Sequence, residues 1–484
     1  MLLSLAAPLL VATAGVTGEQ AKLVDSLDVA PVWAGHPVGF ALLTQPPHQF
    51  VAFYDDRRQM TVAQRRLDEP KWTFSKLPDT TGWDSHNYIA LAADDDGFLH
   101  LSGDMHVVPL VYFRTTKPWD AATFVRVDRM VGSEEERCTY PRFFRGATNE
   151  LLFCYRDGRS GNGNQIFDVY DGPSKTWKRF LDQPLTDGEG KRNAYFDGPT
   201  KGPDGFFHLA WVWRESPDAA TCHDLSYARS RDLKHWKTGA GKPLPLPIRL
   251  GEAAIVDPVP QHGGLLNTSM KLGFDDLHRP TISYHKSDAQ GYTQPFIARL
   301  ESGRWVSHQV TNWPYRWDFD GGGALVVELS VSGACAESDG RLTAAFHHVK
   351  FGNGAWLLDP ETLSAVGLAK REEIPPSLAN VEGRFPGLKV QWAHDSGQSG
   401  TAGTRYKLRW ETLDANRDMP RDGPLPSPSM LRLVTIKTVA DNKPRSKTKG
   451  ADRMKADRAA DATGPAPRSE LKFTPNSIKL PTNG

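Results

Sequence analysis

Two histidines and an amide stand at the turns of one short stretch of sequence. The segment WDSHNYIAL (83–91) carries His86 and Asn87 directly before an apolar run, and HLSGDMH (100–106) carries His106 directly after the next run. Two imidazoles and a carboxamide at one end of neighbouring strands can grip an anion or move a proton. Each histidine could instead cap its own turn, and the pair leaves both interpretations open.

A tyrosine and two arginines follow. CTYPRFF (138–144) places Tyr140 before a proline at the start of another expected strand, and YRDGRSGNGNQ (155–165) holds Arg156 and Arg159 in a glycine-rich loop. Such a loop can present guanidinium and backbone N–H groups to a carboxylate or sulfate. It lacks the Gly-Lys-Ser/Thr of a phosphate loop. A turn with an Asp–Arg ion pair is the alternative, and it suits Arg159 better than Arg156.

The segment KRNAYFDGP (191–199) adds Tyr195, which stands at the same place in its repeat as Tyr140 and His86 in theirs. In a radial repeat protein, equivalent strand ends surround one channel mouth. This equivalence is the strongest internal argument for a site, with Asn87, Tyr195 and Arg159 as candidate substrate-binding residues.

The residue types favour one reaction. Hydrolysis of a glycosidic bond normally needs two flanking carboxylates, and no obvious pair stands out, although Asp84, Asp104 and Asp157 lie nearby. β-Elimination beside a uronic acid needs a neutralised carboxylate, a base for the C5 proton and an acid for the leaving oxygen at C4. Arg, Asn and His can neutralise, while Tyr and His can move protons. A neighbouring arginine makes a tyrosine easier to ionise.

A strand pattern of alternating apolar and polar residues recurs along the chain, and these strands must position the turns described above. Each copy joins a glycine-containing turn to an alternating strand and a second strand, often closed by a tryptophan. The copies number about seven, at roughly 50–65 residues each. The recurring strands are FVAFYDD (50–56), GFLHLSGD (97–104), ELLFCYRD (150–157), GFFHLAWVWR (205–214), RPTISYHKS (279–287), RLTAAFHHV (341–349), LKVQWAHD (388–395) and YKLRWETL (406–413).

Composition agrees with an all-β fold. The 484 residues include 43 Gly and 36 Pro, and amphipathic helical stretches are scarce. A four-stranded sheet cannot bury both faces alone, whereas seven arranged radially cover one another. We therefore predict a seven-bladed β-propeller over residues 19–440. A pair of β-sandwiches is the alternative, and the lack of an interior linker argues against it.

The two ends differ from the middle. Residues 1–18 are apolar and rich in small residues, which predicts a signal peptide and a secreted or periplasmic protein, with a hydrophobic first strand as the alternative. Residues 441–484 have the composition of a disordered tail. No later segment is apolar enough to span a membrane. With 58 basic and 57 acidic residues, the chain lacks the charge of a nucleic-acid binder. We expect a monomer without an organic cofactor.

The sequence resembles the BNR-repeat-like propellers that include ulvan lyases and rhamnosyl-glucuronate lyases. The resemblance implies that His86, His106, Tyr140 and Arg156 line the channel mouth, with an acidic polysaccharide as substrate. Tyr140 and His86 would exchange protons, in an order left open, while Arg156 and His106 hold the carboxylate. The resemblance covers most of residues 20–435. The segments that carry it are DSHNYIAL (84–91), GDMH (103–106), TYPRFF (139–144), YRDGRSGNG (155–163), FHLAWVWRE (207–215), HDLSYARS (223–230) and YKLRWETLDANRDMPR (406–421).

The same resemblance implies a buried structural zinc. Side chains with zinc-ligand chemistry occur on neighbouring repeats, at His208, Cys222, His285 and Cys335, with His223 beside them. Their spacing fits no closed finger motif, and buried Cys and His with backbone partners are an equal alternative. Such a metal would stabilise blades and take no part in chemistry.

Two other functions remain open from the sequence. One is a propeller that binds sugar without catalysis. The other is a sialidase-like glycoside hydrolase, which would need an arginine triad and a Tyr–Glu pair, and for which Glu134, Glu135 and Glu136 near Tyr140 are the available acids.

Overall fold

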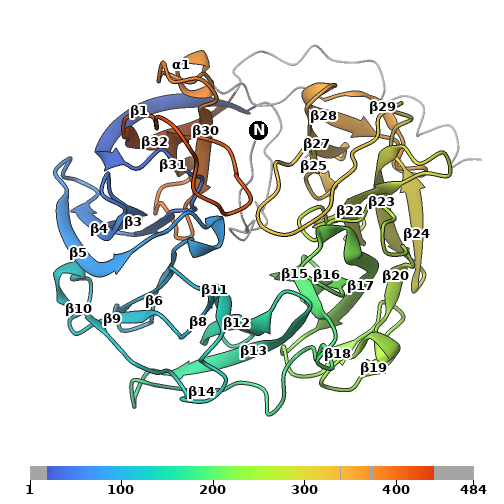
Figure 1. The fold of residues 1–484 in the computed structure, drawn as a ribbon, viewed down its shortest axis with the longest axis horizontal. Helices are drawn as coiled ribbons and strands as arrows, with labels where there is room; N and C mark the ends of the chain where they lie inside the picture. The colour runs from blue at the N-terminus through green and yellow to red at the C-terminus, as the bar shows by residue number, and fades with distance from the viewer. Residues whose placement is uncertain (1–18, 338, 370–374, 441–484) are drawn as a thin grey trace, which may run out of the picture. The chain divides into compact units, whose positions relative to one another are not determined.

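The computed structural model describes residues 19–440, except 338 and 370–374, so the expected signal peptide and tail lie outside the described residues. Within the described residues, the strands form seven antiparallel sheets arranged as a ring (Figure 1). The fold is the predicted all-β, seven-bladed propeller, and the β-sandwich alternative is wrong. The reason is the one given by the sequence: each small sheet buries both faces against its two neighbours.

The first three blades follow one another along the chain. Blade 1 contains β2 (Ala41–Gln45), β3 (His48–Tyr54), β4 (Gln59–Arg66) and β5 (Thr73–Thr80). Blade 2 contains β6 (Ala90–Ala93), β7 (Leu99–Ser102), β9 (Tyr112–Thr115) and β10 (Phe124–Arg126). Blade 3 contains β8 (His106–Val108), β11 (Cys138–Arg145), β12 (Leu151–Arg159), β13 (Asn162–Asp171) and β14 (Thr176–Arg179).

The next three blades continue the ring. Blade 4 contains β15 (Asn193–Lys201), β16 (Phe207–Arg214), β17 (Cys222–Ser230), β18 (Trp236–Lys237), β19 (Pro243–Leu244) and β20 (Ile255–Asp257). Blade 5 contains β21 (Lys271–Phe274), β22 (Pro280–Ser287), β23 (Thr293–Glu301) and β24 (Arg304–Gln309). Blade 6 contains β25 (Leu329–Val331), β26 (Cys335–Ala336), β27 (Leu342–His348), β28 (Gly352–Leu358) and β29 (Ala365–Leu368).

Blade 7 joins the two ends of the described chain. Its strands are β30 (Lys389–His394), β31 (Thr404–Thr412), β32 (Ser429–Ala440) and β1 (Glu19–Val32). β1 pairs with β32 along its length, so the first described strand forms the outer edge of the last blade and closes the ring (Figure 1).

Helices are short in the described residues. They are α1 (Pro376–Ala379) and the 3-10 turns η1 (Ser85–Asn87), η2 (Ala121–Thr123), η3 (Ala219–Thr221) and η4 (Leu250–Glu252). None of the described helices is long and apolar enough to cross a membrane.

Apolar side chains fill the spaces between blades. The most deeply buried large residues include Trp211, Trp213 and Trp236 in blade 4 and Phe50 and Phe53 in blade 1. β16 is buried at all eight positions because its sheet is covered on both faces. This packing holds the strand ends, and therefore the loops that follow them, in fixed places.

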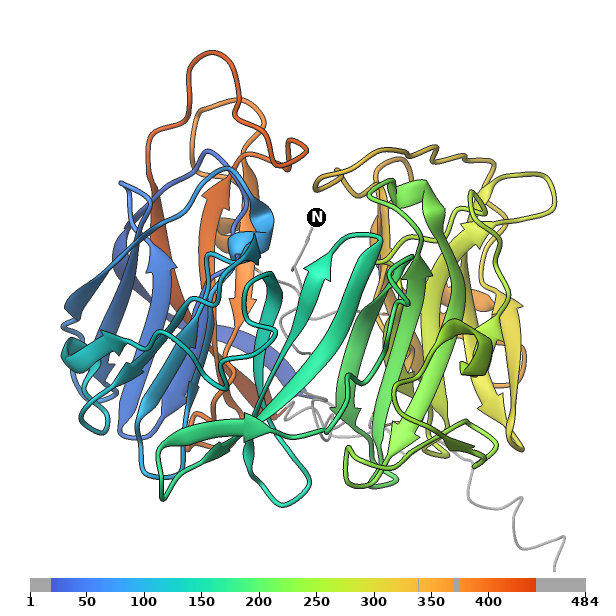
Figure 2. The same ribbon diagram turned by 60° about the horizontal axis from the view of Figure 1, so that its bottom comes forward.

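Two long loops rise from one side of the ring (Figure 2). One joins β24 to β25 and the other joins β31 to β32. They meet where the Arg417 guanidinium donates to the carbonyls of Asp320 and Gly322. The meeting joins the blade 7 loop to the loop that enters the neighbouring blade 6.

Candidate active site

Four aromatic side chains from three successive blades gather at one end of their inner strands. The rings of His86 and His106 stack with centroids 4.0 Å apart, and Tyr140 follows at 5.6 Å from His86. Tyr195 continues the row at 5.9 Å from Tyr140. The structure therefore brings together the residues that occupy equivalent places in the repeats, His86, Tyr140 and Tyr195.

His106 lies on a different blade from the one that the sequence predicted. We expected it in the same blade as His86, but β8 leaves blade 2 and pairs with β11 of blade 3, where His106 lies opposite Thr139. The backbone N–H of Val107 donates to Thr139 Oγ1 at 2.9 Å. The short strand thus carries the second imidazole onto the edge that also bears Tyr140.

Asp84 links the two imidazoles. It caps η1, with Oδ1 accepting from the His86 backbone N–H at 2.8 Å. The same carboxylate lies 2.6 Å from His86 Nδ1 and 2.5 Å from His106 Nδ1. Hydrogen bonds from both histidines outweigh burial and lower the pKa of Asp84, so the carboxylate is ionised and can only accept. Both Nδ1 atoms must then carry protons, which leaves each Nε2 for chemistry.

His86 is held as an imidazolium. A second carboxylate, Asp418, has Oδ2 3.4 Å from His86 Nδ1. Burial is the largest single influence and opposes the charged form, but hydrogen bonds to Asp418 and Asp84 outweigh it and raise the pKa of His86 to about 9. At neutral pH His86 can therefore donate a proton or neutralise an anion, but it cannot accept a proton.

Arg156 lies beneath the tyrosines. Its side chain is only 2% exposed, and its guanidinium donates to Tyr195 Oη at 3.3 Å and to Thr139 Oγ1 at 3.1 Å. The guanidinium carbon also faces the Tyr140 ring, 5.0 Å from the ring centroid. Within the described part of the chain no carboxylate lies within 4.0 Å of it. A buried guanidinium without an anionic partner stabilises any negative charge that forms beside it.

The two tyrosines respond differently to this charge. Burial opposes ionisation of Tyr195, but Arg156 and then Arg214 outweigh it and lower the pKa of that phenol. Burial, followed by the neighbouring Tyr195, raises the pKa of Tyr140 well above its usual value. Because the phenols share one positive environment, Tyr140 stays protonated, and any negative charge settles on Tyr195.

The backbone at these turns is strained. Tyr140 and Val107 have φ values of 62° and 59°, which bulky and β-branched residues rarely adopt. The pairing of β11 with β12 shifts register between Thr139 and Arg142, around Tyr140. Strain of this kind persists only where surrounding contacts enforce it and is typical of functional sites. Here it directs Tyr140 between His86 and Tyr195.

The two remaining substrate-binding candidates lie outside the row of rings. Asn87 is buried, and its amide nitrogen donates to Thr81 Oγ1 at 3.4 Å. Arg159 is exposed at the tip of the β12–β13 hairpin. Their contacts with substrate remain predictions.

The four predicted zinc ligands do not form one site. His208 Nδ1 and Nε2 are engaged by Tyr227 Oη at 2.7 Å and Asp204 Oδ1 at 2.8 Å. Cys222 pairs with Arg214, about six residues or ~20 Å along β16 from His208, so one metal cannot bind both.

The other two candidates also keep separate surroundings. His285 Nδ1 lies 2.8 Å from the Gly264 carbonyl, and its Nε2 has no hydrogen-bond partner. Cys335 pairs with Thr343 at the edge of blade 6. Among the described residues, none of the four belongs to a group of three ligand-type side chains. The predicted set therefore does not fit a zinc centre.

One such group does occur in the described part of the chain, formed by Asp84, His86 and His106, whose ligand-type atoms lie within 4.8 Å of one another. The carboxylate already accepts from both Nδ1 atoms. We therefore interpret the group as two histidines held by hydrogen bonds to a shared carboxylate.

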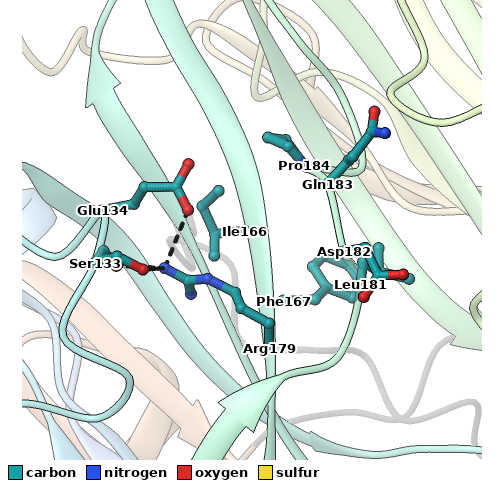
Figure 3. A pocket seen from close by; sticks show the side chains of 9 residues that line it. All are labelled: Ser133, Glu134, Ile166, Phe167, Arg179, Leu181, Asp182, Gln183 and Pro184. Atoms are coloured by element: carbon teal, nitrogen blue, oxygen red, sulfur yellow. Dashed lines mark hydrogen bonds and ion pairs between the residues drawn. The ribbon is translucent and has the colours of Figure 1, made fainter.

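A pocket of about 230 Å³ in blade 3 lies apart from these residues (Figure 3). None of the predicted site residues lines it, whereas Glu134 and Arg179 do, paired at 3.1 Å. Glu135 is buried and accepts from the backbone N–H groups of Met130 and Val131. Glu134 and Glu135, two of the three glutamates considered for a sialidase-like site, therefore have partners away from Tyr140.

Comparisons with known proteins agree with the fold. Residues 48–313 match the model of the BNR repeat-containing family. No curated protein matches the sequence. The solved structure of polysaccharide lyase Uly1 superposes with a TM-score of 0.57 at 16% identity, covering 86% of this chain and 99% of that one. A PL25 ulvan lyase bound to -[GlcA(1-4)Rha3S]- gives 0.54 at 12% identity, covering 87% and 96%. At these identities the likeness shows a shared fold.

Proposed function

The chain belongs to the BNR repeat-containing family, and on that premise we propose that it is a polysaccharide lyase that cleaves a glycosidic bond at C4 of a uronic acid by β-elimination. The observation that carries the proposal is the row of His106, His86, Tyr140 and Tyr195 backed by a buried, carboxylate-free Arg156. These side chains supply positive charge to neutralise a carboxylate, and groups that can accept or donate a proton.

The first requirement of the reaction is to neutralise the uronate. His86 suits this role because it is charged at neutral pH and its Nε2 is not committed to Asp84. As the C5 proton leaves, negative charge builds on the carboxylate, so a fixed cation stabilises the transition state more than the bound substrate. Arg156 adds positive charge from below, through the tyrosines, rather than by direct contact with the sugar.

The second requirement is a base and an acid. His106 donates from Nδ1 to Asp84, which leaves its Nε2 free of that carboxylate, and its side chain is 28% exposed. We assign it the C5 proton. Tyr140 stays protonated and donates to the leaving oxygen at C4. The C5–H electrons form the C4–C5 double bond as the C4–O bond breaks, which balances the reaction. This differs from the assignment implied by resemblance, in which His86 exchanged the proton.

The proposed substrate is an acidic polysaccharide that contains uronic acid and rhamnose. The solved PL25 ulvan lyase was bound to a glucuronate–rhamnose sulfate unit, and the basic, aromatic row here matches the needs of such a unit. A polymer of this size does not enter a cell, so we place the protein outside the cytoplasm. Trp83, half-buried beside Asp84, is edge-on to Trp33 at 4.9 Å and offers an aromatic surface next to the site.

The test is to incubate the purified protein with ulvan and to follow ultraviolet absorbance from the new C4–C5 double bond. The matched control is the same polymer after chemical reduction of its uronate carboxyl groups, which removes the anion and the acidity of C5. Absorbance growth on ulvan alone supports the proposal. Binding of ulvan without any absorbance growth would identify a sugar-binding propeller, and new reducing ends without absorbance would identify a hydrolase.

A further inference from the structure

One carboxylate at the site comes from a distant part of the sequence. Asp418 lies in the loop between β31 and β32, and its side chain is 10% exposed. Oδ1 accepts from the backbone N–H of Ser85 at 3.2 Å and from Ser85 Oγ at 3.1 Å. Ser85 is the first residue of the 3-10 turn that carries His86, so the loop of blade 7 is hydrogen-bonded directly to that turn.

The second oxygen of Asp418 serves two other groups. Oδ2 accepts from the backbone N–H of Ala324 at 2.8 Å and lies 3.4 Å from His86 Nδ1. Both Arg417 and Asp418 have positive φ, at 56° and 59°, an unusual conformation for consecutive non-glycine residues. The strained backbone and its hydrogen bonds together hold one carboxylate of the blade 7 loop against the His86 turn.

We propose that Asp418 is a positioning residue of the active site: it fixes the turn that holds His86 and places a second carboxylate beside the imidazole Nδ1. The inference rests on the proposed function for its role in the reaction. Its physical content, the control of His86 by Asp418, stands on the contacts alone. Asp418 belongs to the segment YKLRWETLDANRDMPR (406–421), which carried part of the family resemblance. The proposal gives this segment a role in positioning His86.

The charged and titratable groups that face His86 come from each element packed against it. Asp84 precedes it on its own turn, His106 stacks on it from β8, Tyr140 approaches from β11, and Asp418 arrives from the blade 7 loop. Behind Asp418 lies the buried His36, with Nε2 3.7 Å from Oδ1. Burial lowers the pKa of His86, and Asp418 and Asp84 together outweigh it, with Asp84 the closer of the two carboxylates at 2.6 Å.

The experiment measures the titration of His86 by NMR of histidine-labelled protein, with its signal assigned by its loss in His86→Asn. Asp418→Asn is expected to lower the His86 midpoint by about one unit or more, since an opposite charge at this distance has an effect of that size. Asp418→Glu keeps the charge and should recover much of the shift. Arg417→Ala is the matched control, because it loosens the same loop without removing the carboxylate.

A purely structural role predicts a different pattern. Asp418→Asn and Arg417→Ala would then lower the melting temperature alike and leave the His86 midpoint unchanged, and that result would overturn the proposal. Where turnover on ulvan is observed, the basic limb of its pH profile should move down in Asp418→Asn by the shift seen in the titration. If the wild-type protein shows no elimination but the midpoint still falls, the proposed function fails and the control of His86 by Asp418 holds.

Discussion

Replacing Asp84 by asparagine should disable both histidines at once. The carboxylate accepts from His86 Nδ1 at 2.6 Å and from His106 Nδ1 at 2.5 Å. An amide of the same shape offers one oxygen and one NH₂ group, so one of the two Nδ1–H groups would face a donor. That imidazole must turn or change tautomer, which moves its proton to the wrong nitrogen for catalysis.

The size of the effect follows from that geometry. The corresponding aspartate-to-asparagine change behind a catalytic histidine in serine proteases lowers turnover by about 10⁴, and the loss of one general acid or base costs about 10²–10⁴. We expect turnover of Asp84→Asn to fall by at least ~10³, with little change in KM. The basic limb should also move below pH 9, because a group whose pKa is raised to about 9 loses part of that increase with its carboxylate.

The assay is the initial rate of absorbance growth on ulvan across a pH series, with circular dichroism to verify folding. Asp79→Asn is the matched control, because Asp79 pairs with Arg126 at 2.7 Å, and no contact with either histidine is seen in the described structure. It should keep nearly full turnover. An Asp84→Asn variant that retains a tenth of wild-type turnover with an unshifted pH profile would refute the shared-carboxylate argument.

Three further expectations concern other parts of the site. Tyr140→Phe should lower turnover by about 10²–10⁴ while circular dichroism stays unchanged, because only the donated proton is lost; near wild-type rates would remove Tyr140 from proton transfer. Arg156→Lys should also be strongly impaired, because one ammonium cannot contact both Tyr195 Oη and Thr139 Oγ1 as the guanidinium fork does, and unaltered turnover would assign Arg156 to packing. Dialysis against a chelator should leave the melting temperature unchanged, since His208 and Cys222 cannot share a metal; a clear fall, with zinc found by elemental analysis, would restore the zinc hypothesis.

The propeller could be predicted because its evidence is local and repeated. Alternating strands, glycine-containing turns and closing tryptophans recur through the chain, and equivalent strand starts must meet at one end of the ring. That logic found His86, Tyr140 and Tyr195 without any contact information. It rests on periodicity, which a single sequence displays directly.

The features that escaped prediction depend on contacts between distant segments. Asp418 lies 333 residues from Ser85 in sequence, and nothing local marks it as a partner of the His86 turn. The move of His106 onto the next blade and the burial of Arg156 under two phenols likewise follow from packing between sheets. The predicted zinc set failed for a related reason: ligand chemistry on adjacent strands says nothing about register, and register separates His208 from Cys222.

The pairing of β1 with β32 has a consequence for how the protein is made. These strands are separated by about 400 residues, so the last blade cannot be completed until nearly the whole described chain has been synthesised, and such distant pairing slows folding. Until then β1, which is synthesised first, lacks its partner strand, and an unpaired strand edge invites association with other chains. The loop that bears Asp418 enters β32 directly, so the same late step that seals the ring also completes the surroundings of His86. A newly made molecule would therefore lack the complete surroundings of His86 until β1 and β32 have paired.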